Sequence, residues 1–555
     1  MKLYSLLLCA SAVCWFGMQD INAQITERPR PVEWDHLVEG ARFIDRFLPM
    51  PAGKLSSDVW GAKDVVPRYV DNGIEDDIRS YWGGNILLGE DNQYHLYVCG
   101  WPENSPKGHM FWPNSTVYHA VCKNSVGPFI IKDTIGPGHN PEAFRLKDGR
   151  VVVYVIDGYY ISDGLNGPWT RKKFDFDKRD RRIIEGLSNL TFAQREDGSY
   201  LMVCRGGGVW ISQTGLSPYN QISDKRAYPP VKGEFEDPVV WRDHVQYHLI
   251  VNDWLGRIAF YQRSKDGINW ITDPGEAYQP GVSFHEDGKV ENWFKYERIK
   301  IFQDKYGRAI QANFAVIDTL KNEDLPNDNH SSKNISIPLN PGVLLTVLDT
   351  KPITEKTKTI RVKIAAEEGF NPQTDIDLNS LRFGASTEVN YGKGCKVLST
   401  KNEGKDLVVT FDAKGNGITA EEFAPKLLGK TTSGKLLFGY ARLPWVSYND
   451  PILSARMPIV SPDSQDMNVV VENFGQVASL PAILKLELLQ DGNRKEVGQA
   501  KLSSLNPYGK TNVSLPGKMK FEKGKAYDFV LTIRTKDNVI STFSYHCEPI
   551  DKMLY

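Results

Sequence analysis

Residues 196–215 read EDGSYLMVCRGGGVWISQTG, and this stretch contains the pattern that decides the fold. The turn residues Glu196-Asp197-Gly198 precede the β-rich run Tyr200–Val203, and Ile211–Gly215 ends the unit with a tight turn from serine to glycine. An aspartate–glycine pair between apolar runs is a strong hairpin signal. The stretch therefore predicts antiparallel strands joined by short turns.

The same pattern recurs on both sides of this stretch. Further β-rich runs begin at Tyr94, Val151 and Tyr247, and serine-to-glycine turns followed by tryptophan recur at 162–164 and 264–267. Recurrence at about 50 residues is typical of repeat architectures. We expect five inner strands, which start at Trp82, Pro141, Leu190, Pro238 and Arg298. The pattern predicts an all-β chain with a five-bladed β-propeller over residues 24–337.

The texture of the sequence changes beyond Pro338. Alternating runs such as Ile360–Ile364 and Leu407–Phe411 lack the aromatic turns of the preceding part. A linker is expected near Arg456–Pro462, and strands resume at Met467–Val471. Strand spacing and alternation predict two β-sandwiches, at residues 338–456 and 457–555.

The N-terminus has the pattern of a secretory signal peptide. Lys2 precedes the apolar stretch Leu3–Met18, and the small residue Ala23 stands directly before Gln24. This pattern predicts removal of residues 1–23 and export to the periplasm or the cell exterior. The alternative is a short buried helix. Lipoprotein anchoring is disfavoured because Cys9 and Cys14 follow leucine and valine instead of a small residue.

Charge and hydropathy exclude two function classes. The chain has 555 residues with 67 basic and 68 acidic side chains, a formal charge of −1, and no block of like charges. This balance argues against a nucleic-acid partner. Outside the first residues no apolar run approaches the ~18 that a membrane span needs, so no transmembrane segment is expected.

The cysteine and histidine pattern gives no cofactor site. Five cysteines remain after residue 23, an odd number, so no disulfide framework is expected, although a bridge between Cys99 and Cys122 stays open. Neither a C-x-x-C pair nor an H-E-x-x-H motif is present. We expect no required cofactor or metal. A structural divalent cation on the propeller axis is left open, although no ligand set points to one.

Polar segments precede each expected inner strand. In a propeller these positions converge on the central axis, where packing between blades does not explain them. The five segments are Ser80–Asn85, Gly138–Glu142, Ser188–Leu190, Phe235–Pro238 and Tyr296–Arg298. Most of their side chains can bond sugar hydroxyls.

The ordered set W-G-x-x, H-N-P, a middle asparagine, E-D-P and E-R resembles secreted five-bladed propeller glycoside hydrolases related to families 43, 32 and 117. The resemblance covers roughly residues 75 to 320. It implies that the chain cleaves glycosidic bonds in a carbohydrate substrate with paired carboxyl groups on the propeller axis. Such cleavage needs one protonated and one ionised carboxyl group, whose pKa values are separated by their surroundings.

The catalytic candidates are Glu236, Asp237 and Glu297. We expect Arg298 to hold Glu297 ionised, and an apolar wall such as Phe235 to keep Glu236 protonated. The alternatives are a turn-capping role for Glu236-Asp237 and a structural ion pair for Glu297-Arg298.

Eight residues are candidates for substrate binding. Trp82 and Trp254 offer flat rings to the apolar faces of sugars. His139 is either the acid, as histidine is in some family 117 relatives, or a ligand of a hydroxyl group. The full set is Trp82, His139, Asn140, Asn189, Arg205, Asp253, Trp254 and Arg298.

The sequence departs from the family pattern at two places. Families 43 and 32 carry an aspartate on the first blade, where Trp82–Asn85 has none, although Asp76 and Asp77 lie upstream. The third blade has Ser188-Asn189 where those families place a glutamate, with Glu185 nearby. Two alternatives therefore remain: a non-catalytic glycan-binding propeller and a protein-interaction scaffold.

Overall fold

The computed structural model describes residues 27–56, 67–181, 187–460, 465, 467–535 and 538–547. The expected signal peptide, residues 1–23, lies outside the described residues. Almost all regular structure in the described part is β-strand, and its α-helical content is the single turn α1 (Ser386–Val389). The prediction of an all-β chain is therefore confirmed. None of the helices in the described residues is long and apolar enough to cross a bilayer.

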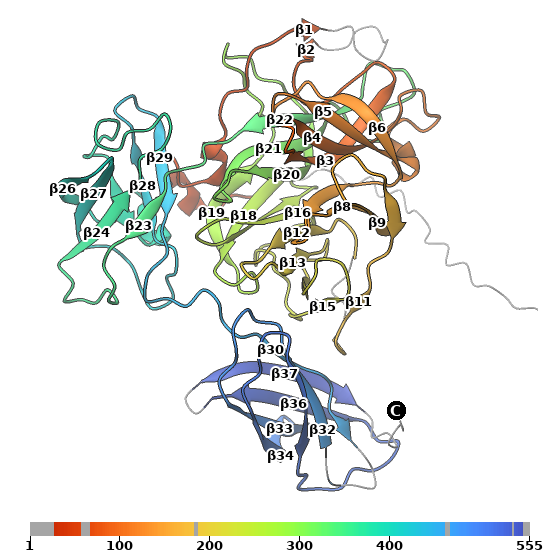
Figure 1. The fold of residues 1–555 in the computed structure, drawn as a ribbon, viewed down its shortest axis with the longest axis vertical. Helices are drawn as coiled ribbons and strands as arrows, with labels where there is room; N and C mark the ends of the chain where they lie inside the picture. The colour runs from red at the N-terminus through yellow and green to blue at the C-terminus, as the bar shows by residue number, and fades with distance from the viewer. Residues whose placement is uncertain are drawn as a thin grey trace, which may run out of the picture.

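Five antiparallel sheets follow one another in the described part of residues 79–338 (Figure 1). The first contains β3 (Arg79–Leu88), β4 (Tyr94–Pro102), β5 (Thr116–Cys122) and β6 (Ile130–Pro137). The second contains β7 (Glu142–Arg145), β8 (Val151–Val155), β9 (Gly158–Ser162) and β10 (Thr170–Lys172). The third contains β12 (Thr191–Gln194), β13 (Tyr200–Val203), β14 (Val209–Ser212), β15 (Tyr219–Gln221) and the added parallel strand β11 (Phe176–Asp177).

The last two sheets complete this part of the chain. The fourth contains β16 (Phe235–Arg242), β17 (Tyr247–Asp253), β18 (Ile258–Ser264) and β19 (Ile271–Tyr278). The fifth contains β20 (Lys295–Gln303), β21 (Ala309–Ile317) and β22 (Ser332–Pro338). The apolar runs recognised in the sequence are the second strands of the first four sheets. These strands are almost continuously buried because neighbouring strands flank them on both edges and neighbouring sheets cover both faces.

The first strands of successive sheets lie against one another. β3 contacts β7, β12 contacts β16, β16 contacts β20, and β20 contacts β3. Side chains join the backbones across these boundaries: Asn85 bonds both the N–H and the C=O of Ala143, and Glu142 accepts the N–H of Phe192 at 2.8 Å. The starts of all five first strands are thereby brought to one end of a common axis.

The middle part of the chain is a two-sheet domain. Its first sheet orders β23 (Leu345–Val347), β24 (Thr359–Ile364), β27 (Asp406–Asp412) and β26 (Val397–Glu403). Its second orders β25 (Arg382–Gly384), β28 (Lys426–Lys430) and β29 (Leu436–Tyr440). Ile360, Phe411 and Leu427 from the two sheets share one buried core, so the two sheets form a sandwich.

The C-terminal part is a second two-sheet domain, drawn in blue in Figure 1. One sheet contains β30 (Leu453–Ala455), β31 (Ile459–Val460), β32 (Met467–Asn473) and β35 (Lys510–Leu515). The other orders β34 (Asn493–Leu502), β33 (Ala482–Gln490), β36 (Tyr527–Arg534) and β37 (Val539–Cys547). The domain begins before the expected boundary at residue 457 because β30 pairs with the end of β32.

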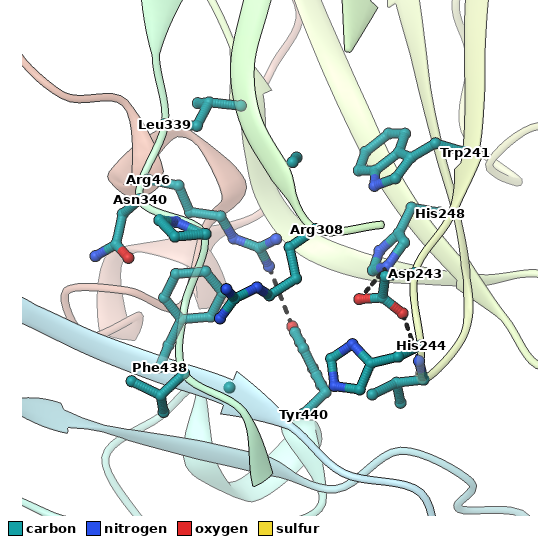
Figure 2. Close-up of a pocket in the computed structure, with 15 residues that line it drawn as sticks. Arg46, Trp241, Asp243, His244, His248, Arg308, Leu339, Asn340, Phe438 and Tyr440 are labelled. Carbon is teal, nitrogen blue, oxygen red and sulfur yellow. Dashed lines mark hydrogen bonds and ion pairs between the residues drawn. The ribbon is translucent and has the colours of Figure 1, made fainter. Parts of the chain in front are cut away.

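A buried polar interface joins the middle domain to the fourth and fifth sheets (Figure 2). Arg46, at the end of the 3₁₀ turn η2 (Phe43–Arg46), lies over the rings of Phe43, Tyr261 and Phe438 at 4.5–5.0 Å. Its Nη2 donates to the Tyr440 hydroxyl at 3.3 Å. The N-terminal segment therefore lies between the two domains as part of their shared core.

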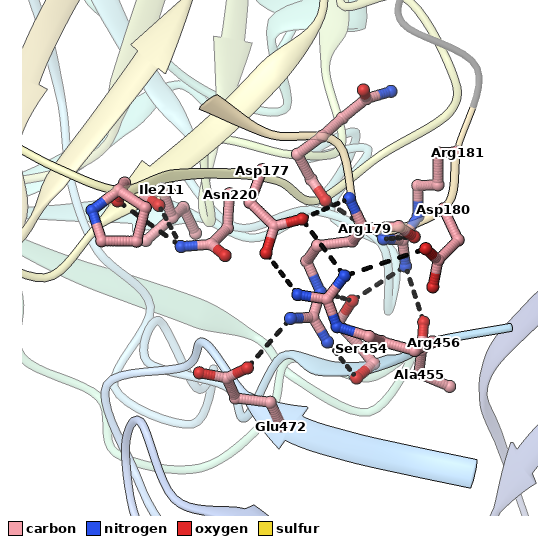
Figure 3. A network of polar contacts seen from close by, with 12 residues as sticks. Asp177, Arg179, Asp180, Arg181, Ile211, Asn220, Ser454, Ala455, Arg456 and Glu472 are labelled. Atoms are coloured by element: carbon pink, nitrogen blue, oxygen red, sulfur yellow. Dashed lines mark hydrogen bonds and ion pairs between the residues drawn. The ribbon is translucent and has the colours of Figure 1, made fainter. Parts of the chain in front are cut away.

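A second interface joins the C-terminal domain to the third sheet (Figure 3). Arg179 is fully buried, lies over the ring of Phe474 at 4.6 Å, and donates to Glu472 and to the hydroxyl of Ser454. Arg456 pairs with Asp177 at the same place. Both sandwiches are thus held to the preceding sheets by charged side chains taken out of water.

Candidate active site

Near the start of each of the five first strands stands a residue with φ close to +55°, and in β3 a second glycine with positive φ, Gly84, follows it. The φ angles of the five residues are +50 to +61°, and bulges interrupt β3, β16 and β20 beside them. We call this set the axial belt: Gly83, Asn140, Asn189, Asp237 and Arg298. Glycine, asparagine and aspartate adopt this conformation readily, whereas for arginine it costs about 1–2 kcal/mol. Strain of this kind concentrates at functional sites.

Hydrogen bonds run along the axial belt from residue to residue. Nδ2 of Asn140 donates to Oδ1 of Asn189 at 3.0 Å, and Nδ2 of Asn189 donates to Oδ1 of Asp237 at 2.9 Å. Nη1 of Arg298 donates to the same Asp237 oxygen at 2.6 Å. A Cβ atom at Gly83 would lie 3.7 Å from Cβ of Arg298 and 3.8 Å from Oδ1 of Asn140. The belt therefore closes around the axis.

Glu236 extends from the belt toward solvent. Its carboxylate pairs with Nε of Arg205 at 3.2 Å and accepts Nδ2 of Asn189 at 3.1 Å. Burial raises its pKa to about 7, with a further increase from the neighbouring charges of Asp237 and Glu297 that Arg205 only partly offsets. That Glu236 carries a proton stays a prediction; the causes of its raised pKa are burial and negative neighbours.

Glu297 is buried between two lysines. Nζ of Lys295 lies 3.5 Å from one carboxylate oxygen, and Nζ of Lys321 donates to the other. Arg298, which the sequence suggested as its partner, binds Asp237 instead. Arg298 has the left-handed conformation at the bulge of β20, and both its guanidinium and its backbone N–H bond to Asp237 of β16.

Asp237 is almost fully buried and hydrogen-bonded on both oxygens. Oδ1 of Asp237 accepts hydrogen bonds from Nδ2 of Asn189 and from Nη1 of Arg298. Oδ2 accepts one from the backbone N–H of Arg298 at 3.2 Å. Burial lowers the pKa of Arg298, but the charge and hydrogen bond of Asp237, together with smaller contributions from Tyr154 and Glu236, raise it above its ordinary value. The carboxylate is therefore placed to hold its neighbours in position and has no free oxygen for a substrate.

His139 lies behind the belt in an aromatic environment. Its Nδ1 lies 2.9 Å from Oγ of Ser115, and its ring is 4.6 Å from that of Trp112. Burial, with the nearby charges of Arg298 and Lys321, lowers the pKa of His139 well below its usual range. A neutral imidazole suits a hydrogen-bonding ligand better than an acid near neutral pH.

The two tryptophan candidates differ in their exposure. Trp82 is buried, and the ammonium group of Lys321 lies 4.7 Å from its ring centroid, so the ring is not free to stack on a sugar as expected. Trp254 is partly exposed and lies beside Lys295, at 5.0 Å, and Glu297 in a small cavity. Trp254 is therefore the ring that a ligand near Glu297 meets first.

Asp253 is placed differently from the expected sugar contact. It is fully buried, and its carboxylate binds Nε of Arg28 at 2.5 Å and the backbone N–H groups of Glu234 and Gly256 at 3.1 Å. These hydrogen bonds hold parts of the protein together and do not face a ligand. Asp253 ends its strand, and a residue at this position can anchor the adjoining loops as well as line a site.

A larger cavity lies farther along the same first strands. It has a volume of about 560 Å³ and is lined by residues such as Leu87, Phe144, Phe192 and Phe302. The ion pair of Glu142 with Lys300 lies on the wall between this cavity and the belt. No strained non-glycine residue lines it, in contrast to the belt end.

The described residues contain no group of three or more histidine, cysteine, aspartate or glutamate side chains placed to hold a metal ion. Cys99 and Cys122, for which a bridge was left open, are both free thiols.

The sequence patterns did not identify two residues that contact Glu297 in the structure, Lys295 and Lys321. Lys295 precedes Glu297 by two residues in β20, and this strand spacing places both on one face. That spacing could have identified it. Lys321 comes from the connection between β21 and β22 and has no sequence signal, because only the fold brings it to Glu297.

The chain has low sequence identity to the solved structures that it resembles. No protein-family model and no curated protein matches the chain. It is similar to a solved structure described as a glycoside hydrolase, with 10% identity and a TM-score of 0.32 over 84% of this chain and 97% of the other. It is also similar to the GH43 protein BlXynB from Bacillus licheniformis, with 10% identity and a TM-score of 0.30 over 85% of this chain and 89% of the other.

Proposed function

We propose that the chain is an exported glycoside hydrolase and that the five sheets of residues 79–338 are the blades of a five-bladed propeller that forms its catalytic domain. The carboxylates Glu236 and Glu297 lie at the same end of adjacent first strands, β16 and β20, which supports this proposal. The substrate class is a carbohydrate, and no cofactor has a role in the reaction.

The observation that carries the proposal is the contrast between the two glutamates. Glu236 has a pKa raised to about 7 by burial and by Asp237, so a large part of it is protonated at neutral pH. Glu297 lies between two ammonium groups that balance a negative charge. One protonated and one ionised carboxyl group is the combination that glycosidic cleavage requires.

In the proposed reaction Glu236 donates its proton to the glycosidic oxygen, and the bond from this oxygen to the anomeric carbon breaks. Glu297 either takes a proton from the attacking water or bonds to the anomeric carbon before water releases the sugar. Water is consumed, and the leaving sugar carries the proton from Glu236. Asp237 acts as a positioning residue that orients Asn189 and Arg298 around this pair.

The remaining candidates surround this pair. Asn189 and Arg205 contact Glu236 directly, and Trp254 borders Glu297. His139 and Asn140 complete the far side of the belt, where Oδ1 of Asn140 has no hydrogen-bond partner. We propose these residues as hydroxyl and ring contacts of the substrate.

The test is sugar release from a panel of plant, algal and host oligosaccharides by the wild type and by Glu236→Gln and Glu297→Gln. General acid–base catalysis contributes roughly 10²- to 10⁴-fold, so each amide variant should lose at least that much turnover while still binding product. Glu234→Gln is the matched control, because Glu234 is exposed two residues before Glu236. Equal rates for wild type and both amide variants would remove these residues from the mechanism.

A non-catalytic glycan-binding protein is the second candidate function. Gly83 occupies the belt position of the first sheet, where the family resemblance implies an aspartate. Binding of oligosaccharides by the wild type without release of sugar from any of them would favour this function.

A further inference from the structure

Among the described side chains that form ion pairs with Glu236 or Glu297, the cations outnumber these two carboxylates. Arg205, Lys295 and Lys321 contact the two carboxylates directly. The buried pairs of Asp237 with Arg298 and of Asp253 with Arg28 are neutral within themselves. With both glutamates ionised the excess is one positive charge, from three cations and two anions, and it becomes two when Glu236 is protonated.

A fourth cation borders the same place. Arg257 lines the small cavity with Trp254, Lys295 and Glu297, and its Nη1 donates to the backbone C=O of Phe294 at 3.3 Å. In this contact the partner of Arg257 is a neutral carbonyl group, so no carboxylate balances the charge of the guanidinium there. A ligand that approaches Glu297 past Trp254 therefore meets further positive charge.

Each of the two lysines lies over one tryptophan ring. The ammonium groups of Lys321 and Lys295 lie 4.7 and 5.0 Å from the ring centroids of Trp82 and Trp254. Each is fixed between an indole ring and Glu297, a geometry in which the attraction of cation to ring adds to the ion pair. The site beside Glu297 therefore has two positive charges that are held in fixed positions.

Arg205 is the cation most open to a ligand. Its side chain is 49% exposed and, within the part of the chain that the structure describes, its ion pair is to one oxygen of Glu236. A guanidinium group presents several N–H donors in a planar fork that matches carboxylate and sulfate oxygens. In the centre of the belt, Nε and Nη2 of buried Arg298 have no hydrogen-bond partner among the described residues.

We propose that the substrate is an anionic glycan whose carboxylate or sulfate group binds Arg205 next to the scissile bond. This inference rests on the proposed glycoside hydrolase function and narrows its substrate class. Neutral sugars would leave the positive excess of the site uncompensated, whereas a uronate or a sulfated sugar neutralises it.

The proposal also couples binding to acid strength. Arg205 lowers the pKa of Glu236. A substrate anion that takes over the guanidinium weakens this effect, so the pKa of Glu236 rises and a larger fraction carries the proton. Only a substrate that carries the anionic group would raise the pKa of Glu236 in this way.

The experiment measures binding to matched pairs of oligosaccharides by calorimetry, with the full-length Glu236→Gln variant to prevent turnover. The probes are oligouronates before and after chemical reduction of their carboxyl groups, and sulfated galactan oligosaccharides before and after desulfation. At least one anionic probe should bind roughly tenfold to a hundredfold more tightly than its neutral partner, as expected for charge-assisted hydrogen bonds. The pair that shows the difference identifies carboxylate or sulfate as the source.

Arg205→Met, added to Glu236→Gln, should remove that preference, so that anionic probes and their neutral partners bind with similar affinity. Arg150→Met is the matched control, because Arg150 forms an exposed ion pair with Asp148 in the turn between β7 and β8. Anionic probes that bind no better than their neutral partners, or a preference that survives Arg205→Met, would overturn the inference. Hydrolysis by the wild type is measured separately, so that anionic binding without sugar release refutes only the hydrolase, and release from neutral probes alone refutes only the anionic substrate.

Discussion

Glu236 combines a visible sequence signal with a property that only its neighbours create. The E-D-P triplet identifies it in the sequence, but its raised pKa depends on burial and on charges from other strands. Lys295 could be predicted from its spacing to Glu297 in one strand. The pairing of Arg298 with Asp237 could not, because the two residues meet only when the fourth and fifth sheets lie side by side.

The first residue-scale prediction concerns the pH dependence of turnover. A general acid works only while protonated, so the rate should fall as pH rises through about 7, the pKa of Glu236. Arg205 lowers this pKa, so Arg205→Met should move the falling limb to higher pH. The measurement is kcat/KM from pH 5 to 9 for both proteins, because this ratio reports the pKa of the free enzyme. A limb in the same place for both would show that Arg205 does not tune the acid.

The second residue-scale prediction concerns the belt. Asp237→Asn keeps a residue that tolerates positive φ but leaves the Arg298 charge buried without its partner. Removing one member of a buried ion pair costs about 3–5 kcal/mol, so the free energy of unfolding should fall by about this amount. Denaturant unfolding measures it, and Glu236→Gln, at a partly exposed neighbour, serves as the control. A loss below about 1 kcal/mol would contradict a structural role for this pair.

At the scale of elements, the second strands of the first four sheets could be predicted and the first strands only in part. Runs such as Val151–Val155 are apolar throughout because both faces are buried. The first strands are short or bulged and mix polar with apolar residues, because they pack side by side around an axis. Their partners lie in other sheets, which local pattern does not reveal.

Asn85 tests how these first strands are joined. Its side chain bonds the N–H and the C=O of Ala143 at 2.6 and 2.7 Å, which links β3 to β7. Asn85→Ala leaves two buried backbone groups without partners, at about 1–3 kcal/mol each. The melting temperature and the free energy of unfolding should both fall, whereas exposed Asn114→Ala should leave them unchanged. Equal stability of the two variants would show that this link is dispensable.

At the scale of the whole molecule, the interface with the middle domain should make stability depend on pH. Lys426 is fully buried and donates to Gly40 and Asn390 at 2.7 Å. Burial and the charge of Arg46 lower its pKa to about 7. Between pH 7 and about 10 the unfolded chain therefore binds a proton that the folded chain lacks, so the free energy of unfolding should rise with pH.

Lys426→Met should flatten this rise, which denaturant unfolding at several pH values would measure. Lys430→Met, at an exposed residue of the same strand, is the control and should keep the slope of the wild type. An unchanged slope in Lys426→Met would mean that other groups govern the dependence.

The left-handed positions of the axial belt also bear on how distant relatives can be recognised. Backbone geometry admits few residue types at four of the belt positions, whatever substrate each protein has evolved to use. A search profile weighted toward glycine, asparagine and aspartate at these points, each followed within a few residues by a β-strand, should recover homologues that percentage identity overlooks.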